Sequence, residues 1–377
     1  MKALDYKLQN YVWGPTGTQS YVGQLAAHAA EIIESTHYAE LWVGCHPNGP
    51  SSLKCSSKSN LSLEQYLKRP LSFLFKVLHV NSPLSIQIHP CKYLAQQLHS
   101  SFPQVYPDSN DKPEMLIALT PFRCMAGFKD VESVQSLIES LPPLTNIFSS
   151  HTPLKPSDVT SVFVSLFQLD KTILDQCISS LHSYLDSPKL SPHTRTALEL
   201  FVSLHRSFPN DPAVLSPFFL QIWDLLPHEA LFLPSECIHG YLSGCCIEIM
   251  KPSDNVIRAG LTPKKIDAQA MSSVLLTHDV PSPVFYPLPK DSVSVLELLP
   301  PTEHRVFKLY LIKLSEGESY QVELEPGVAK ILLVLSGSGV VNHDDVMMGN
   351  AFVSLESCFD VVGGSAGLEL SLVCETV

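Results

Sequence analysis

The feature that most constrains the fold is a series of short apolar runs, each cut off by Gly or Pro turns. Two of them, 72–78 and 84–89, lie in the first part of the chain. Three more, 330–335, 351–355 and 368–373, lie in the last hundred residues. Runs of this length bounded by turn residues are typical of β-strands. Many such strands predict a mainly β protein, built as a sandwich or jelly roll.

The stretch 129–227 has a different pattern. Apolar residues recur at helical spacing: Ile173, Leu174, Cys177, Ile178, Leu181 and Leu185. The segment 197–204 repeats this spacing, and Pro188 and Pro192 separate the two segments. We therefore predict that helices interrupt the β-rich sequence here and that they supply no metal ligand. Strand patterns return at 230–233.

Charge and composition exclude several classes of function. The net charge is -12 and no basic stretch stands out, which argues against a nucleic-acid partner. No run approaches the ~20 apolar residues that span a bilayer, so we expect no membrane partner. The sequence shows no signal peptide, and its ten Cys are irregularly spaced. We expect a cytoplasmic protein with reduced thiols. An anionic ligand would need a local cluster of Lys and Arg.

Four residues form a candidate metal set. Gln87 and His89 are two positions apart, so on a strand their side chains point to the same face. Glu114 follows Pro113, and His239 follows a predicted strand and precedes a Gly turn. Two imidazoles, a carboxylate and an amide oxygen suit zinc with an open position. Spacing alone favours the plainer alternative, in which His89 is a strand histidine with an ordinary hydrogen bond and Glu114 is a surface carboxylate.

Several segments, in the same order along the chain, resemble type I mannose-6-phosphate isomerases. They are YVWG at 11–14, AELWVGCHP at 39–47, PLSIQIHP at 83–90, KPEM at 112–115, GCCIE at 244–248 and SDNVIRAGLTPK at 253–264. The resemblance covers nearly the whole chain, and six such segments in order are highly specific.

The resemblance implies a cupin-like jelly-roll catalytic domain with a helical insertion and a second, C-terminal β-barrel. We expect the catalytic domain at 1–128 and 228–275, the helical domain at 129–227 and the C-terminal jelly roll at 276–377. It also implies one Zn²⁺ per chain, held by Gln87, His89, Glu114 and His239. The implied reaction is the interconversion of mannose 6-phosphate and fructose 6-phosphate by a monomer that serves mannose and GDP-mannose metabolism.

The isomerisation moves a proton between C1 and C2 through an enediol, and needs a base and a group that stabilises the oxyanion. Glu248 is a candidate base or base-orienting group; alternatively it is a buried carboxylate paired with Lys or Arg. Arg258 matches the family's active-site arginine and could anchor phosphate or stabilise the enediolate. Its alternative is a structural pair with Asp254.

Other residues are candidates for contact with the phosphorylated sugar. Lys112, which we also count as catalytic, and Lys264 supply the local positive charge that the acidic chain requires. Trp13 could wall the pocket or be a core aromatic. Ser85 shares a face with Gln87 and could reach the phosphate or be a small packing residue.

The sequence departs from the family pattern at four positions near these motifs. Asp111 stands where the family has His, Cys91 and Cys245 where it has Asp, and Cys45 where it has Thr. None is an expected ligand, but residues that orient ligands can change metal affinity or activity about 10–100-fold. Two alternatives stay open: a zinc-binding sugar-phosphate binder with weak or no turnover, and another cupin enzyme such as an iron oxygenase.

Overall fold

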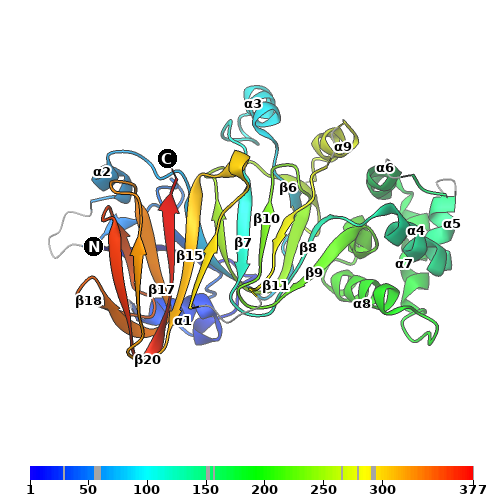
Figure 1. The fold of residues 1–377 in the computed structure, drawn as a ribbon. Coiled ribbons are helices and arrows are strands. Elements are labelled where there is room, and N and C mark those ends of the chain that lie inside the picture. Colours follow the sequence, from blue (N-terminus) through cyan, green and yellow to red (C-terminus); the bar gives the residue numbers. More distant parts are fainter. Residues whose placement is uncertain are drawn as a thin grey trace.

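The structure is a computed structural model that describes residues 1–28, 30–54, 61–149, 153–155, 158–264, 266–277, 280–289 and 294–376. Two antiparallel sheets dominate it, which confirms the predicted mainly β fold (Figure 1). None of the helices in these ranges is long and apolar enough to cross a membrane.

The first sheet, here called the central sheet, has eleven strands. Its main order is β13 (Val284–Tyr286), β10 (Ala230–Leu233), β7 (Glu114–Ala118), β11 (His239–Met250), β5 (Leu74–Val80), β3 (Glu40–Val43) and β2 (Lys7–Gln9). A second layer pairs with the first half of β11: β6 (Ile86–Ile88), β12 (Ile257–Gly260), β8 (Phe122–Phe128) and β9 (Leu220–Leu225). The strand β11 therefore links both layers.

The second sheet, here called the terminal sheet, has nine strands. Its order is β14 (Val295–Leu298), β15 (Phe307–Leu314), β20 (Cys358–Glu375), β17 (Lys330–Val341), β19 (Ala351–Ser354), β1 (Lys2–Asp5) and β4 (Ser52–Leu53). In addition, β16 (Ser319–Glu323) pairs with β20, and β18 (Asp344–Met347) pairs with β17. The first strand of the chain thus belongs to a sheet built mainly from its last hundred residues.

One apolar cluster joins the two sheets. It contains Phe75 and Val77 of β5 together with Leu309 of β15 and Ile331 of β17, all fully buried. The alternation of β5, in which every second residue faces this cluster, follows from the pleat of a strand. Burial of this apolar area is the main force that holds the sheets together.

The described helices lie outside the sheets. They are α1 (Tyr21–Ala27), α2 (Leu63–Leu67), α3 (Lys92–Ser101), α4 (Val131–Ser140), α5 (Pro142–Phe148), α6 (Asp158–Ser165), α7 (Lys171–His182), α8 (Pro192–Ser207) and α9 (Ala268–Thr277). Short 3-10 turns are η1 (Gly17–Gln19), η3 (Leu166–Gln168), η4 (Pro212–Phe218) and η5 (Thr302–His304). Helices α4–α8 gather at the end of the molecule opposite the terminal sheet, whereas α3 and α9 lie beyond one end of the strands of the central sheet (Figure 1).

The helical spacing at 173–185 and 197–204 is confirmed by α7 and α8. Each begins at a polar cap, as their sequences allow: the Asp170 carboxylate accepts from Thr172 N, and Ser191 Oγ accepts from Thr194 N. Leu174, Ile178 and Leu181 of α7 point into the apolar cluster shared by the helices. The division of the chain into four domains stays a prediction.

Three details differ from the expectations. Residues 220–225 lie in the stretch expected to be helical but form strand β9, because pairing with β8 overrides the local pattern. His239 does not precede a turn: it begins the twelve-residue strand β11, in which Gly240 pairs with Met125 of β8. The strands described in the terminal sheet run from β14 to β4 without closing, so this sheet is open rather than a barrel.

Candidate metal centre

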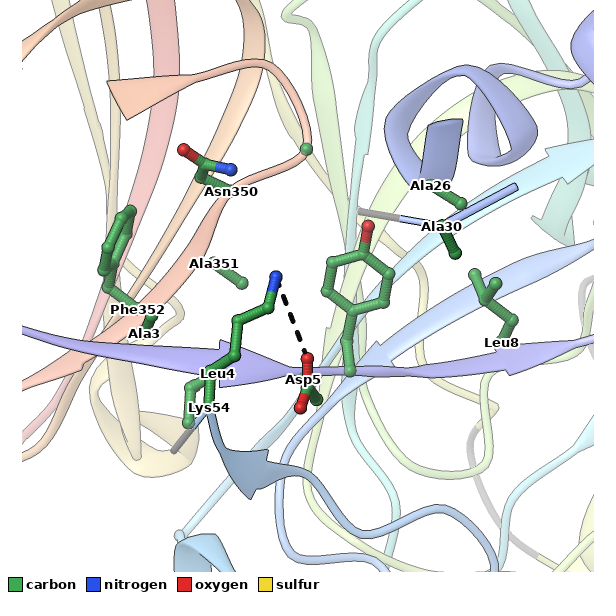
Figure 2. A pocket seen from close by; sticks show the side chains of 12 residues that line it. Ala3, Leu4, Asp5, Leu8, Ala26, Ala30, Lys54, Asn350, Ala351 and Phe352 are labelled. Carbon is green, nitrogen blue, oxygen red and sulfur yellow. Dashed lines mark ion pairs between the residues drawn. The ribbon is translucent and has the colours of Figure 1, made fainter. Parts of the chain in front are cut away.

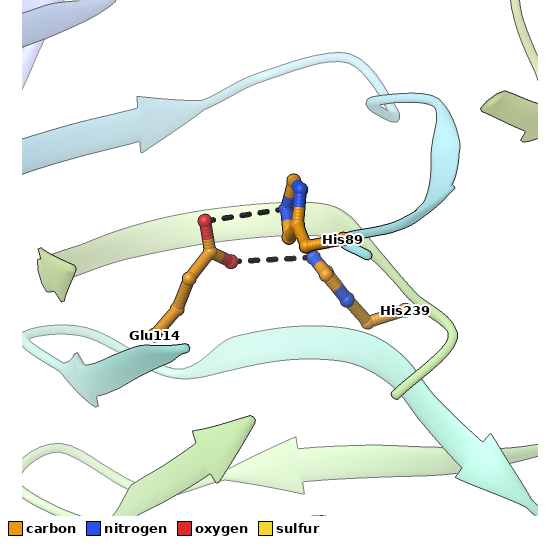
Figure 3. Close-up of side chains that lie close together, drawn as sticks. All are labelled: His89, Glu114 and His239. Atoms are coloured by element: carbon orange, nitrogen blue, oxygen red, sulfur yellow. Dashed lines mark ion pairs between the residues drawn. The ribbon is translucent and has the colours of Figure 1, made fainter. Parts of the chain in front are cut away.

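Three side chains converge between the two layers of the central sheet. His89 directly follows β6, which ends at Ile88, and His239 begins β11. Their strands are neighbours, since His239 is in register with Gln87. Glu114 begins β7 in the other layer, directly after Pro113. Figure 3 shows His89, Glu114 and His239 pointing toward one another.

The distances in this set suit a four-coordinate metal ion. The carboxylate oxygens of Glu114 lie 3.3 Å from His89 Nε2 and 3.3 Å from His239 Nε2. The side-chain amide nitrogen of Gln87 lies 3.3 Å from His239 Nε2, and exchanging the two amide atoms would place its oxygen there. Ligands about 2.0–2.1 Å from zinc in a tetrahedron lie roughly 3.3–3.4 Å apart. The three ionisable residues are at most 2% exposed.

The far ring nitrogens show which nitrogens are free to bind. His89 Nδ1 lies 2.8 Å from the carbonyl oxygen of Asn255, and His239 Nδ1 lies 2.9 Å from that of Cys237. A carbonyl can only accept, so both Nδ1 atoms carry the proton and both Nε2 atoms present a lone pair to the site. Buried His89 Nε2 and Glu114 Oε2 have no hydrogen-bond partner. An ordinary hydrogen-bonded histidine and a surface carboxylate do not describe these two residues.

The electrostatics favour the ligand forms of these groups. Burial, followed by the positive charge of Lys112, lowers the pKa of His89, which keeps the ring neutral. Burial alone would raise the pKa of Glu114, but its basic neighbours, among them the ammonium of Lys112, lower it well below its usual value. Lys112 Nζ lies 3.4 Å from Glu114 Oε1, so this candidate residue stands beside the metal set. A neutral imidazole and an ionised carboxylate are the states that bind a metal.

Arg258 lies next to the metal set, and its guanidinium is paired with none of the described side chains. It is in register with Gln87 across β12 and β6, and the pairing shifts at a bulge between Arg258 and Gly260. Bulges of this kind redirect side chains beside functional sites. The guanidinium makes no hydrogen bond or ion pair to any described residue. The expected alternative, a pair with Asp254, is absent: Asp254 lies 3.3 Å from His46 Nε2.

Glu248 belongs to a buried charge network. Its two carboxylate oxygens accept from Lys76 Nζ at 2.9 Å and from Tyr241 OH at 2.8 Å. Burial would lower the pKa of Lys76, but Glu248 and Glu40 outweigh it and raise the pKa. The ammonium also lies 5.0 Å from the centre of the Trp42 ring. This pairing with a lysine is the structural alternative considered for Glu248.

Three further residues, Ser85, Trp13 and Lys264, were expected to contact the sugar phosphate. Ser85 is half-buried and immediately precedes β6. Trp13 is half-buried, stacks on Tyr11 with ring centres 5.9 Å apart, and packs partly against the core. Lys264 is exposed in the loop after β12, where its backbone N–H donates to Thr262 Oγ1.

The four departures from the family pattern lie outside the metal set. Asp111 forms an ion pair with Lys251 Nζ at 2.5 Å. Cys91 occupies the N-cap position of α3, where its side chain accepts no capping hydrogen bond. Cys45 packs against the cluster between the sheets, and Cys245 is buried with its backbone N–H donating to Thr120 Oγ1. All of the described cysteines are free.

Local sequence patterns did not indicate Lys76, Tyr241 or His46 as functional candidates. Lys76 carried a signal, because it is a lone charge inside an apolar strand and such charges are buried only when paired. His46 and Glu40 lie in the segment 39–47 that carried the resemblance, but nothing in their spacing indicated their partners.

A separate cavity lies away from this site. Figure 2 shows it beside β1 and β19, with an ion pair of 4.0 Å between Lys54 and Asp5 at its wall. Its volume is about 220 Å³, and no residue of the metal set lines it.

Comparisons with known proteins agree with the geometry. Residues 1–131 match the family model for the catalytic domain of phosphomannose isomerase type I. Human mannose-6-phosphate isomerase is 36% identical over 304 residues, covering 72% of each chain. Mannose-6-phosphate isomerase 1 of Arabidopsis thaliana is 33% identical over 384 residues, covering 93% of this chain and 88% of that protein.

Solved structures give the same result. A lysine-to-alanine variant of phosphomannose isomerase from Salmonella typhimurium superposes with a TM-score of 0.80 at 25% identity, and each chain is covered completely. A mannose 6-phosphate isomerase bound with zinc and yttrium superposes with a TM-score of 0.77 at 25% identity, again over both whole chains. The expected cupin-like fold is confirmed by these matches. The chain belongs to the type I mannose-6-phosphate isomerase family, a family of isomerases.

Proposed function

We propose that this protein interconverts mannose 6-phosphate and fructose 6-phosphate with one bound zinc ion. The observation that carries the proposal is the convergence of His89, Glu114 and His239, in which His89 Nε2 and Glu114 Oε2 are buried without a hydrogen-bond partner. This set occurs in a chain whose relatives from several organisms are named mannose-6-phosphate isomerase.

Gln87, His89, Glu114 and His239 would hold the metal. Two imidazole nitrogens with carboxylate and amide oxygens suit zinc, and a similar protein has been solved with zinc bound. Bound there, zinc would polarise a sugar oxygen or lower the pKa of a water molecule. The neutral ring of His89 and the charged carboxylate of Glu114 support this role.

The cationic residues would stabilise the negative charge of the substrate. The phosphate brings a dianion to a protein of net charge -12. Arg258 has no partner among the described residues, so its forked donors are free for the phosphate or for the oxyanion of the enediolate. Lys112 stands beside Glu114 and can stabilise the same developing charge. Ser85, Lys264 and Trp13 are proposed as further contacts with the sugar phosphate.

The proton that leaves C2 returns to C1, so the reaction needs one base that is regenerated in each cycle. Both oxygens of Glu248 are engaged by Lys76 and Tyr241, which favours a base-orienting role for this carboxylate. Its tie to Tyr241 brings it near the metal set, because the Tyr241 and His239 rings lie 5.8 Å apart. Glu248→Gln tests this role through the pH dependence of kcat.

A coupled assay that detects mannose 6-phosphate formation from fructose 6-phosphate, run on protein with a measured metal content, tests the whole proposal. Turnover that requires about one zinc per chain supports it. Zinc without turnover, together with sugar-phosphate binding, indicates the non-catalytic alternative. Iron in place of zinc and no isomerisation would indicate a different cupin enzyme.

The proposal extends to the setting of the enzyme. We propose a cytoplasmic monomer that acts in mannose and GDP-mannose metabolism. Free thiols at the described cysteines are consistent with a reducing compartment. Light scattering of the purified protein tests the monomer, and limited proteolysis tests the proposed boundaries near 128, 227 and 275.

A further inference from the structure

Hydrogen bonds to the carboxylate of Asp108 join two loops that lie beside the metal set. The loop before β7 contains Asp108 and Asn110, and the loop before β12 contains Ser253 and Asn255. We call these four residues the loop clamp. Asp108 accepts four hydrogen bonds: from Asn110 N at 2.8 Å, Ser253 Oγ at 2.9 Å, Asp254 N at 2.9 Å and Asn255 Nδ2 at 3.0 Å. Three of the four donors come from the other loop.

Asn255 adds further hydrogen bonds to the loop clamp. It is fully buried, and its Nδ2 also lies 2.8 Å from the carbonyl oxygen of Asp108 and 2.9 Å from that of Asn110. Its backbone N–H donates to Ser253 Oγ at 3.2 Å. These hydrogen bonds fix the orientation of the Asn255 peptide, and Asp108 takes part in several of them.

The loop clamp contacts the metal set through the backbone oxygen of Asn255. The carbonyl oxygen of Asn255 accepts from Nδ1 of His89 at 2.8 Å, which fixes both the tautomer and the orientation of that ring. Partners of this kind typically change metal affinity by about 10–100-fold when removed. The two clamped loops also lead directly into Glu114 and Arg258.

We propose that Asp108 is a positioning residue for the metal site, acting through the carbonyl of Asn255 on His89. It touches neither the metal nor the substrate in this role. The inference rests on the proposed metal-dependent function, and it gives the Asp108 carboxylate a part in the relative placement of His89, Glu114 and Arg258.

The test is the metal affinity of Asp108→Ala, with Co²⁺ as a spectroscopic probe. We expect the variant to bind Zn²⁺ about 10-fold or more weakly, measured by competition with a chelator. The visible absorption bands of the Co²⁺-loaded protein should shift, because the ligand geometry around the ion changes. Excess Zn²⁺ should restore part of the lost turnover, which it would not do for a misfolded protein.

Asp170→Ala is a matched control, since Asp170 also accepts from backbone N–H groups but at the start of α7, away from the metal set. It should lose stability and keep the wild-type Zn²⁺ affinity and Co²⁺ spectrum. If Asp108→Ala fails to fold, Ser253→Ala, which removes one hydroxyl from the loop clamp and leaves Asp108 in place, should weaken Zn²⁺ binding in the same direction. Wild-type affinity and spectrum in the folded variant, or wild-type affinity in Ser253→Ala, would overturn the inference. A wild-type protein that binds no Zn²⁺ would instead overturn the proposed function.

Discussion

His239 connects the two layers of the central sheet at the metal set. It is 1% exposed, and its Nδ1 is engaged by the carbonyl of Cys237 while Nε2 faces Glu114. His239→Ala should therefore lose both bound zinc and turnover, because the three remaining ligands hold the ion weakly. Metal analysis and the coupled assay measure this. Full activity after thorough chelation of the wild-type protein would contradict the assignment.

Arg258→Ala should lower kcat with the zinc content unchanged. The guanidinium has no structural partner among the described residues, so its removal leaves the fold intact. Losing a charge-assisted hydrogen bond used mainly in the transition state costs about 3 kcal/mol, roughly a hundredfold in rate.

Steady-state kinetics separate the possible roles of Arg258. A rise in KM alone identifies it as a phosphate anchor. If neither parameter changes, the arginine has no part in catalysis. Arg123→Ala serves as the control, because that arginine pairs with Asp224 on the surface.

The sequence predicts local relations between site residues better than distant ones. Gln87 and His89 share a face because a strand alternates, and that follows from two positions in the chain. The pair Lys76 and Glu248 depends on the register of β5 against β11, residues 172 positions apart. Register arises from the packing of whole strands, so no local pattern could have indicated this pair.

Helix α8 is capped by the serine that directly precedes it. Ser191 Oγ accepts from Thr194 N at 3.0 Å and satisfies one of the free donors at the helix start. Ser191→Ala should lower the free energy of unfolding by about 1 kcal/mol, measured with urea, without changing zinc content.

Ser179→Ala is the comparison for α8, since Ser179 is an exposed serine inside α7. Alanine is the better helix former, so this change should be neutral or slightly stabilising. Equal effects of the two substitutions would show that the cap contributes nothing measurable.

Elements with strong periodicity were the ones that the sequence could predict. Residues 230–233 form β10 as expected, and α7 and α8 follow the spacing of their apolar residues. β9 was missed because its residues, 220–225, become a strand only by pairing with β8. The length of β11 was missed because Gly240 and Gly244 indicate turns, although here they lie within a strand.

The way the chain passes between its two sheets could not be predicted from local patterns. β1 pairs with β19, about 350 residues away, and the next strand, β2, already belongs to the central sheet. Such pairing depends on the apolar cluster between the sheets, which forms only in the folded molecule. A boundary drawn along the sequence near residue 276 therefore leaves out strands β1 and β4 of the terminal sheet.

One ion pair links the sheets and gives a pH-dependent contribution to stability. His228, in the turn between β9 and β10, lies 2.8 Å from Glu369 of β20. Burial alone would raise the pKa of Glu369, but the hydrogen bond and charge of His228 lower it below the usual value of 4.5. A carboxyl with a lowered pKa binds its proton more readily in the unfolded chain. Its contribution is therefore present above about pH 4.5 and is lost as the pH falls through the folded pKa.

Glu369→Gln tests this link between the sheets. The variant should be less stable than the wild type at about pH 7. The difference should close as the pH falls through the lowered folded pKa of Glu369, because below it the glutamate and the substituted glutamine are both neutral. Urea unfolding at a series of pH values measures the difference. Glu316→Gln, at an exposed glutamate, should show no such dependence. A difference that stays constant with pH, or that is absent at about pH 7, would mean that the charge of Glu369 does not stabilise the contact between the sheets.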